Sequence, residues 1–241
     1  MKRTHMLRIK SAPHLSSAEF GMALTSRIFR RWRASIDSRF EVKEIHIRDV
    51  DFKGKASVES VLFVHMAVFH GEPLQKKIVV LRGHTVAMMP ILMCRGVPYT
   101  ILAVEPRLAI GKLKSRALSA GMVDNGTFVG AAAREIEEEL DLCFREDELI
   151  DITPSHIPKD EGIALSAGLL DEQVRIYIAQ RVVTRRELKA LQGKATGLAS
   201  EHEQITLKVV RLADLYKETN DCKAFVALAL YESWQRNNIE K

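Results

Sequence analysis

Along this chain, a series of short apolar runs precedes a segment with a helical pattern. Between residues 42 and 104, short apolar or alternating runs are separated by turns that contain glycine or proline. A period of two over such short runs is typical of β-strands. We therefore expect strands over residues 42–50, 58–68, 77–81, 86–93 and 99–104.

The pattern changes near residue 128. Residues 128–142 are rich in alanine and glutamate and predict a helix. Thr184 is the expected N-cap of a later helix that Gly193 ends. Further elements are expected at residues 174–178 and 205–210, as strands, and at residues 184–192 and 224–235, as helices. Strands followed by mixed strands and helices predict an α/β (α+β) fold with a mixed sheet.

Residues 17–33 predict one amphipathic helix, with Ser16 or Ser17 as its cap. Its apolar residues recur at every fourth position, namely Phe20, Leu24, Ile28 and Trp32. The surrounding segment is basic, because residues 1–39 contain nine Lys or Arg against Glu19 and Asp37. This composition leaves two interpretations open, an organelle transit peptide and a folded basic helix.

Composition excludes several classes of protein. The chain is 46% hydrophobic and 28% charged, as ordinary globular proteins are. Its most apolar stretch, residues 86–94, contains a proline and is far shorter than the roughly 20 residues of a membrane helix. Cys94, Cys143 and Cys222 lack the spacing of a zinc site or a disulfide framework. We expect no membrane partner.

The run from Arg134 to Glu139 carries the candidate chemistry. Glu135 and Glu139 are four residues apart and share a helical face, with Glu138 beside them. Like charges at this spacing destabilise a helix, and a divalent cation bound between them would reverse the effect. Carboxylate oxygens suit Mg²⁺. For this run taken alone, a solvated acidic surface is the alternative.

The surrounding residues resemble a known motif. Residues 121–142 are similar to the Nudix box, in which a glycine loop precedes a helix with the pattern REUxEE, where U is apolar. The likeness to plant-type ADP-sugar diphosphatases and ADP-ribose pyrophosphatases extends over roughly residues 12–238. It also includes Phe20, Arg82, Arg107 and residues 29–32, 171–172, 191–194, 196–198 and 230–232.

The resemblance implies a fold and an assembly. It implies a Nudix-type α/β/α sandwich with a mixed sheet over residues 76–241. Residues 1–75 would form an N-terminal helix and strand region that takes part in dimerisation, so a homodimer is expected. It favours a folded N-terminus from about residue 15. The expected location is the cytoplasm or the interior of an organelle such as the mitochondrion.

The resemblance also implies an activity. This is Mg²⁺-dependent cleavage, with Mn²⁺ as a substitute, of the diphosphate linkage in a nucleotide-sugar of the ADP-sugar or ADP-ribose type, giving AMP and a sugar phosphate. The implied metal ligands are Ala120, through its carbonyl, Glu135, Glu138, Glu139 and Glu203. The implied catalytic residues are Glu201, Glu203 and Glu138. The implied substrate-binding residues are Arg82, Arg107, Asp171 and Glu172.

Several positions depart from the box. Its loop glutamate is replaced by Gly126 or Thr127, depending on the end from which the loop is counted. Residues 117–119, Ala-Leu-Ser, stand in place of Glu-Leu-Pro. Asp141 replaces the glycine that ends the helix, and it must therefore adopt the left-handed conformation that aspartate tolerates better than most residues.

A second class of function competes with the first. Residues 27–33 interleave arginines with Phe29 and Trp32, as RNA-binding segments do. The alternatives are a protein that binds RNA or acts on its 5′ pyrophosphate or cap, and an interaction module with weak catalysis. Because Phe29 and Trp32 also lie near the apolar face of the expected helix, packing competes with RNA stacking as their use.

Overall fold

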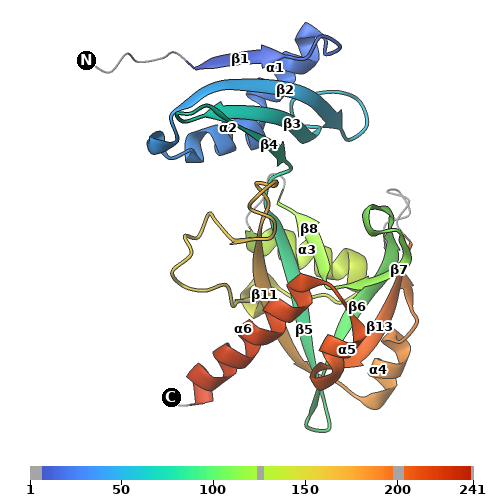
Figure 1. Ribbon diagram of the computed structural model, residues 1–241. Helices are drawn as coiled ribbons and strands as arrows, with labels where there is room; N and C mark the ends of the chain where they lie inside the picture. The colour runs from blue at the N-terminus through green and yellow to red at the C-terminus, as the bar shows by residue number, and fades with distance from the viewer. Residues whose placement is uncertain (1–6, 124–127, 198–203, 240–241) are drawn as a thin grey trace. The chain divides into compact units, whose positions relative to one another are not determined.

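The computed structural model describes residues 7–123, 128–197 and 204–239, apart from the side chains of Arg134 and Glu135. The chain forms two compact units (Figure 1). Unit 1 comprises Met1–His84 and Ala164–Gln173, and unit 2 comprises Thr85–Ile163 and Val174–Lys241. The boundary expected between residues 75 and 76 falls at the start of the last strand of unit 1.

Unit 1 is a small sheet covered by two helices. Its elements are β1 (Arg8–Ser11), α1 (Ser17–Thr25), α2 (Arg27–Ser35), the 3-10 turn η1 (Ser38–Phe40), β2 (Val42–Phe52), β3 (Val61–His70) and β4 (Gln75–Leu81). The sheet has the order β1-β2-β3-β4, with β1 parallel to β2 and the other pairs antiparallel. Apolar residues of both helices pack on β2 and β3, with Phe29 and Met66 among the most buried.

The single helix expected over residues 17–33 was wrong, because it divides at Ser26. Ser26 has an extended backbone (φ −58°, ψ 150°) and is 1% exposed. Its hydroxyl donates to the Ala23 carbonyl at 2.7 Å and accepts the Phe29 N–H at 3.3 Å. One buried serine thus ends α1 and begins α2. The expected cap at Ser16 is confirmed, since its hydroxyl accepts the Glu19 N–H.

Unit 2 contains a larger mixed sheet. Its strands are β5 (Thr85–Cys94), β6 (Val97–Arg107), β7 (Lys112–Ala117), β8 (Ser119–Met122), β9 (Ile150–Asp151), β10 (Ile163–Ala164), β11 (Gln173–Val182), β12 (Ala195–Thr196) and β13 (Ile205–Arg211). Its helices are α3 (Phe128–Leu140), α4 (Arg185–Leu191), α5 (Leu215–Glu218) and α6 (Cys222–Ile239). The order is β10-β11-β5-β6-β13-β12, with β7 on β6, β8 on β5 and β9 on β11. Because β11 is parallel to β5 while β6 is antiparallel, the expected mixed α/β fold is confirmed.

Strand β5 lies at the centre of unit 2 and is buried on both faces. Val86, Met88 and Leu92 belong to one core cluster with the apolar face of α3. Residues on the opposite face, such as Met89 and Ile91, are also fully buried. Helix α6 contacts β5 as well, and Figure 1 shows α3 behind this sheet and α6 in front of it. Helices thus cover both faces, as in a three-layer sandwich.

Most elements of unit 2 lie where the hydrophobic pattern predicts them. The N-cap at Thr184 is confirmed by a capping box with Glu187, and Gly193 follows the helix with a φ of 77°. Strands β7 and β8, which lead to α3, were not expected from the sequence. In the part of the chain that the structure describes, no helix is long and apolar enough to cross a membrane.

Candidate active site

Helix α3 places its acidic residues at the edge of the core of unit 2. Ala132, Ile136 and Leu140 recur every fourth residue and are fully buried in the cluster around β5. Glu139 precedes the last of these and is 7% exposed, whereas Glu138 is exposed to solvent. The helix therefore holds one carboxylate at the margin of the core and presents another to solvent.

The end of α3 has the conformation that the sequence predicted. Asp141 has a φ of 52°, in the left-handed region. The helix is closed there by the Asp141 N–H, which donates to the Glu137 carbonyl at 3.0 Å, and by the Leu142 N–H, which donates to the Ile136 carbonyl at 3.3 Å. Asp141 thus adopts the left-handed conformation that glycine usually supplies at a helix end.

Strand β12 and the turn before it contact this end of α3 through a hydrogen bond and an ion pair. The Thr196 hydroxyl donates a 2.6 Å hydrogen bond to the backbone carbonyl of Glu139. The Lys194 ammonium forms an ion pair with the Asp141 carboxylate. The strand therefore satisfies a carbonyl in the last turn of the helix, where carbonyls lack helical partners. No pattern in the sequence predicted that Thr196 and Lys194 contact α3.

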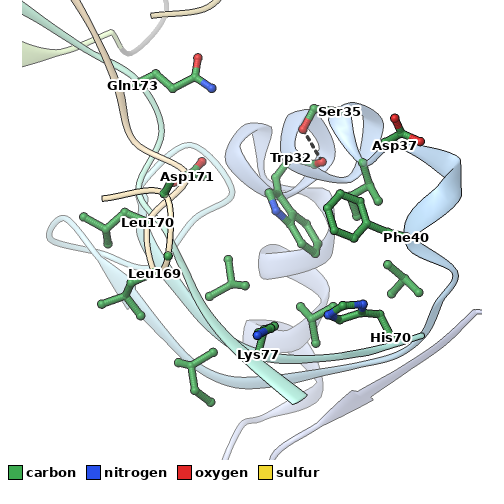
Figure 2. A pocket seen from close by; sticks show the side chains of 17 residues that line it. Trp32, Ser35, Asp37, Phe40, His70, Lys77, Leu169, Leu170, Asp171 and Gln173 are labelled. Atoms are coloured by element: carbon green, nitrogen blue, oxygen red, sulfur yellow. Dashed lines mark hydrogen bonds between the residues drawn. The ribbon is translucent and has the colours of Figure 1, made fainter. Parts of the chain in front are cut away.

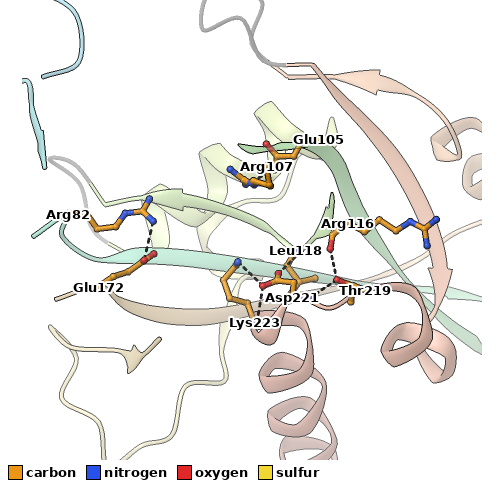
Figure 3. Close-up of polar contacts among 9 residues, drawn as sticks. All are labelled: Arg82, Glu105, Arg107, Arg116, Leu118, Glu172, Thr219, Asp221 and Lys223. Atoms are coloured by element: carbon orange, nitrogen blue, oxygen red, sulfur yellow. Dashed lines mark hydrogen bonds and ion pairs between the residues drawn. The ribbon is translucent and has the colours of Figure 1, made fainter. Parts of the chain in front are cut away.

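Strand β8 precedes α3 and runs beside it. Ala120 of β8 pairs with Ala87 of β5, so its backbone is part of the sheet. At the start of β8, the Leu118 N–H donates to the Asp221 carboxylate at 3.1 Å (Figure 3). Asp221 also accepts the backbone N–H and the ammonium of Lys223 at the start of α6. This network positions the strand that leads to the box.

Arg107 is the last residue of β6 and forms an ion pair with Glu105 of the same strand (Figure 3). Its side chain is 48% exposed, so the guanidinium remains accessible to a ligand. Glu105 is paired across the hairpin with Ser115 of β7. The expected role of Arg107 in binding substrate stays a prediction.

The other expected substrate residues lie in unit 1. The Arg82 guanidinium contacts the buried carboxylate of Glu172 at 3.1 Å (Figure 3). The Asp171 carboxylate accepts the N–H groups of Arg82 and Gly83 at 2.8 and 3.2 Å. Burial raises the pKa of Asp171, although these two bonds oppose the shift. These contacts give the three residues a structural use, and their role toward substrate stays a prediction.

Three of the expected acidic residues lie outside the part of the chain described here. These are the side chain of Glu135 and all of Glu201 and Glu203. Among the described side chains, no three of His, Cys, Asp and Glu are grouped as they would be around a metal ion. The described contribution to the expected metal site is therefore Glu138, Glu139 and the Ala120 carbonyl.

The basic helix α2 uses its aromatic residues for packing. Phe29 is 1% exposed, and its ring centroid lies 5.9 Å from that of Trp32. Trp32 is partly buried against the core of unit 1. The Phe29 ring is therefore inaccessible to a nucleic-acid base, which removes one of the two aromatic groups on which the RNA interpretation depended.

Comparison with known proteins decides the family. The chain is 30% identical over 245 residues to Nudix hydrolase 14, chloroplastic, of Arabidopsis thaliana, and the match covers 96% of this chain and 78% of that protein. The chain belongs to the Nudix hydrolase family. It is accordingly a hydrolase. The helix α3 carries the residues that resemble the Nudix box. No family model matches the chain.

A solved structure supports the Nudix fold. The chain is similar to the crystal structure of an ADP compounds hydrolase, with a TM-score of 0.52 and 17% identity. The match covers 82% of this chain and 97% of that one. At this identity the likeness concerns the fold. It agrees with the mixed sheet and the covering helices of unit 2.

Proposed function

We propose that this Nudix hydrolase cleaves the diphosphate linkage of an ADP-sugar or ADP-ribose type of compound, giving AMP and a sugar phosphate. The observation that carries the proposal is the position of Glu139. Its carboxylate is held at the margin of the core, next to the fully buried Leu140, on the helix that carries the box pattern. Burying a carboxylate is unfavourable unless charge or hydrogen bonds compensate it, and a bound divalent cation supplies compensation of this kind.

The described residues fit a hard divalent cation. A carboxylate from Glu139, an exposed carboxylate from Glu138 and the backbone oxygen of Ala120 are oxygen ligands, which Mg²⁺ prefers. Glu135 and Glu203 complete the proposed ligand set by resemblance to the family. When bound, Mg²⁺ or Mn²⁺ supplies charge neutralisation at the phosphates and lowers the pKa of a coordinated water.

The chain's own residues then bind the substrate and move a proton. Glu203, or Glu201 in its place, accepts the proton of the attacking water. Arg107 binds a phosphate oxygen through its accessible guanidinium, whose fork of N–H groups suits such oxygens. Arg82, Asp171 and Glu172 are proposed to act on the substrate side, Asp171 and Glu172 from the partner subunit of a homodimer.

The proposed assembly and location rest on likeness to relatives. The family resemblance supports dimerisation through unit 1, and light scattering of the purified chain measures whether it is a dimer. An organelle interior is proposed from the basic, acid-poor start of the chain and from the chloroplastic relative. A fluorescent protein fused to the C-terminus would report the compartment.

A substrate panel tests the proposed activity. The purified chain is incubated with ADP-glucose, ADP-ribose, NADH or capped RNA, each with Mg²⁺, with Mn²⁺ and with excess EDTA. The proposal predicts metal-dependent release of AMP from ADP-glucose or ADP-ribose. Release from capped RNA alone, or retention of RNA with no phosphate product, would contradict it and support the RNA alternative.

A further inference from the structure

Unit 1 contains a pocket of its own. Its volume is about 640 Å³, within the range of roughly 300–1,000 Å³ that small-molecule sites occupy. Every residue that lines it belongs to unit 1. The floor is the face of the sheet formed by the end of β3 and the middle of β4, and the walls come from α2, the segment after it and residues 167–173 (Figure 2).

The pocket exists because the helical layer is shorter than the sheet. Helix α2 packs on the face that carries Val68 and Val79, and it ends at Ser35 with Ile36 as its C-cap. The same face continues past the end of the helix to Lys77, which pairs across the strands with Val68. Apolar sheet surface therefore stays open where a helix would otherwise cover it.

Aromatic side chains gather around this opening. The rings of Phe40 and His70 meet edge to face with centroids 5.8 Å apart. Trp32 faces the pocket beside Phe40 (Figure 2). Phe40 is 55% exposed, so its ring is accessible to a ligand. Three rings around one opening favour a planar aromatic ligand, because aromatic groups prefer stacked or edge-to-face partners.

Lys77 supplies the pocket with a cation. Lys77 has no carboxylate within ion-pair distance in the described part of the chain. The two acids that line the pocket are already engaged. Asp37 is bound by Arg39, and Asp171 accepts two backbone N–H groups. Among the described atoms, the Trp32 indole N–H also makes no hydrogen bond, so a cation and a neutral donor are both available to a ligand.

We propose that this pocket, whose lining residues differ from the proposed metal ligands, is a binding site for a small planar aromatic molecule that carries one anionic group. The ring lies among Trp32, Phe40 and His70, and the anionic group meets the Lys77 ammonium. A carboxylate and a phosphate monoester share this chemistry. The site is a place of recognition only, and no reaction is assigned to it.

Trp32 provides a direct measurement of binding. The chain has two tryptophans, so the Trp234→Phe variant leaves Trp32 as the single fluorescent reporter. Titration with 2-naphthoate and with 2-naphthyl phosphate distinguishes the two anionic groups, and 2-naphthamide supplies the same ring without charge. We expect saturable quenching by at least one of the two anions and at least tenfold weaker binding of the amide.

Two lysines on adjacent positions of β4 give a matched pair of variants. Lys77 lines the pocket, whereas Lys76 points to the opposite face because side chains alternate along a strand. Lys77→Gln should weaken binding of the anion about tenfold, and Lys76→Gln should leave it unchanged. Phe40→Leu, at an exposed position, should weaken binding of both the anion and the amide.

Three results would overturn the proposal. The first is absence of saturable quenching by both anions. The second is an equal effect of the Lys76 and Lys77 variants, which would indicate general attraction to a basic surface. The third is competition, in which the naphthyl anion raises the KM for the hydrolysed substrate in proportion to its concentration. That result would make the pocket part of the substrate site.

Discussion

The Thr196 hydroxyl donates a 2.6 Å hydrogen bond to the backbone carbonyl of Glu139. The bond connects β12 with the last turn of the helix that carries the acidic residues. Lys194, in the turn before β12, pairs with Asp141 directly after the helix. The position of the Glu139 carboxylate therefore depends on contacts made by a strand more than fifty residues further along the chain.

Replacing Thr196 by valine should lower kcat clearly and the free energy of unfolding only slightly. The change keeps the shape and removes one hydrogen bond, which costs about 1 kcal/mol of unfolding free energy. A shifted Glu139 should lower kcat by about tenfold, with little change in KM. Urea unfolding and steady-state kinetics measure the two effects. Thr206→Val on the neighbouring β13, at an exposed position, is the control and should change neither.

Asp141 gives a test of the helix end. Its φ of 52° is a conformation that alanine adopts at a cost of roughly 1 kcal/mol and that glycine adopts freely. Asp141→Ala should therefore lower the urea midpoint. Asp141→Gly should stay within about 0.5 kcal/mol of the wild type, since relief of strain offsets the lost exposed ion pair with Lys194. Equal stability of the two variants would contradict a left-handed residue here.

Arg107→Gln should raise KM for the diphosphate substrate by about tenfold or more, because a charged hydrogen bond to phosphate is lost. The fold should tolerate the change, since the arginine is half exposed and its ion pair with Glu105 is a surface pair. Arg116→Gln is the matched control, because Arg116 is also partly exposed and pairs with Glu218. An unchanged KM in Arg107→Gln would end the proposed role.

Asp171 should make the stability of the fold depend on pH. Burial raises its pKa above the ordinary value of 3.8, so the folded chain binds this proton more tightly than the unfolded chain does. The free energy of unfolding should therefore fall as pH rises from about 3.8 through the raised pKa, and then level off. Asp171→Asn keeps an acceptor oxygen for the Arg82 and Gly83 N–H groups and should remove this decline.

The measurement for Asp171 is urea unfolding across that pH range, with wild type and variant compared at each pH. Asp160→Asn, at an exposed position, is the control for loss of one negative charge. A difference between wild type and Asp171→Asn that is constant with pH, or that favours the wild type increasingly as pH rises, would contradict the buried acid.

Local patterns in the sequence were sufficient to predict much of the fold. Alternating runs located β2 to β6, because a half-buried strand needs an apolar residue at every second position. The cap at Thr184 and the left-handed Asp141 followed from the chemistry of helix ends. Ser26 was missed because its hydroxyl ends one helix and begins the next, a use that periodicity does not reveal.

The acidic residues of the candidate site could be predicted from the sequence, but the contacts that hold them in position could not. Residues 134–139 carry the box pattern in consecutive letters, whereas the contacts of Thr196 with α3 and of Asp221 with Leu118 join residues far apart in the chain. No local pattern encodes such pairs. Strands β7 and β8 were missed for a related reason. Their residues alternate only weakly between apolar and polar, and they become strands by pairing with β6 and β5.

Glu139 is proposed to take part in hydrolysis, and a comparison of two glutamates on the same helix tests this role. Glu139→Gln removes a nearly buried charge within the box pattern, whereas Glu137→Gln removes an exposed charge that the pattern does not require. With Mg²⁺ and a substrate that the wild type hydrolyses, the rate of AMP release should fall at least ~10²-fold in Glu139→Gln and less than about twofold in Glu137→Gln. Unchanged turnover in a folded Glu139→Gln protein, or an equal loss in both variants, would contradict the account.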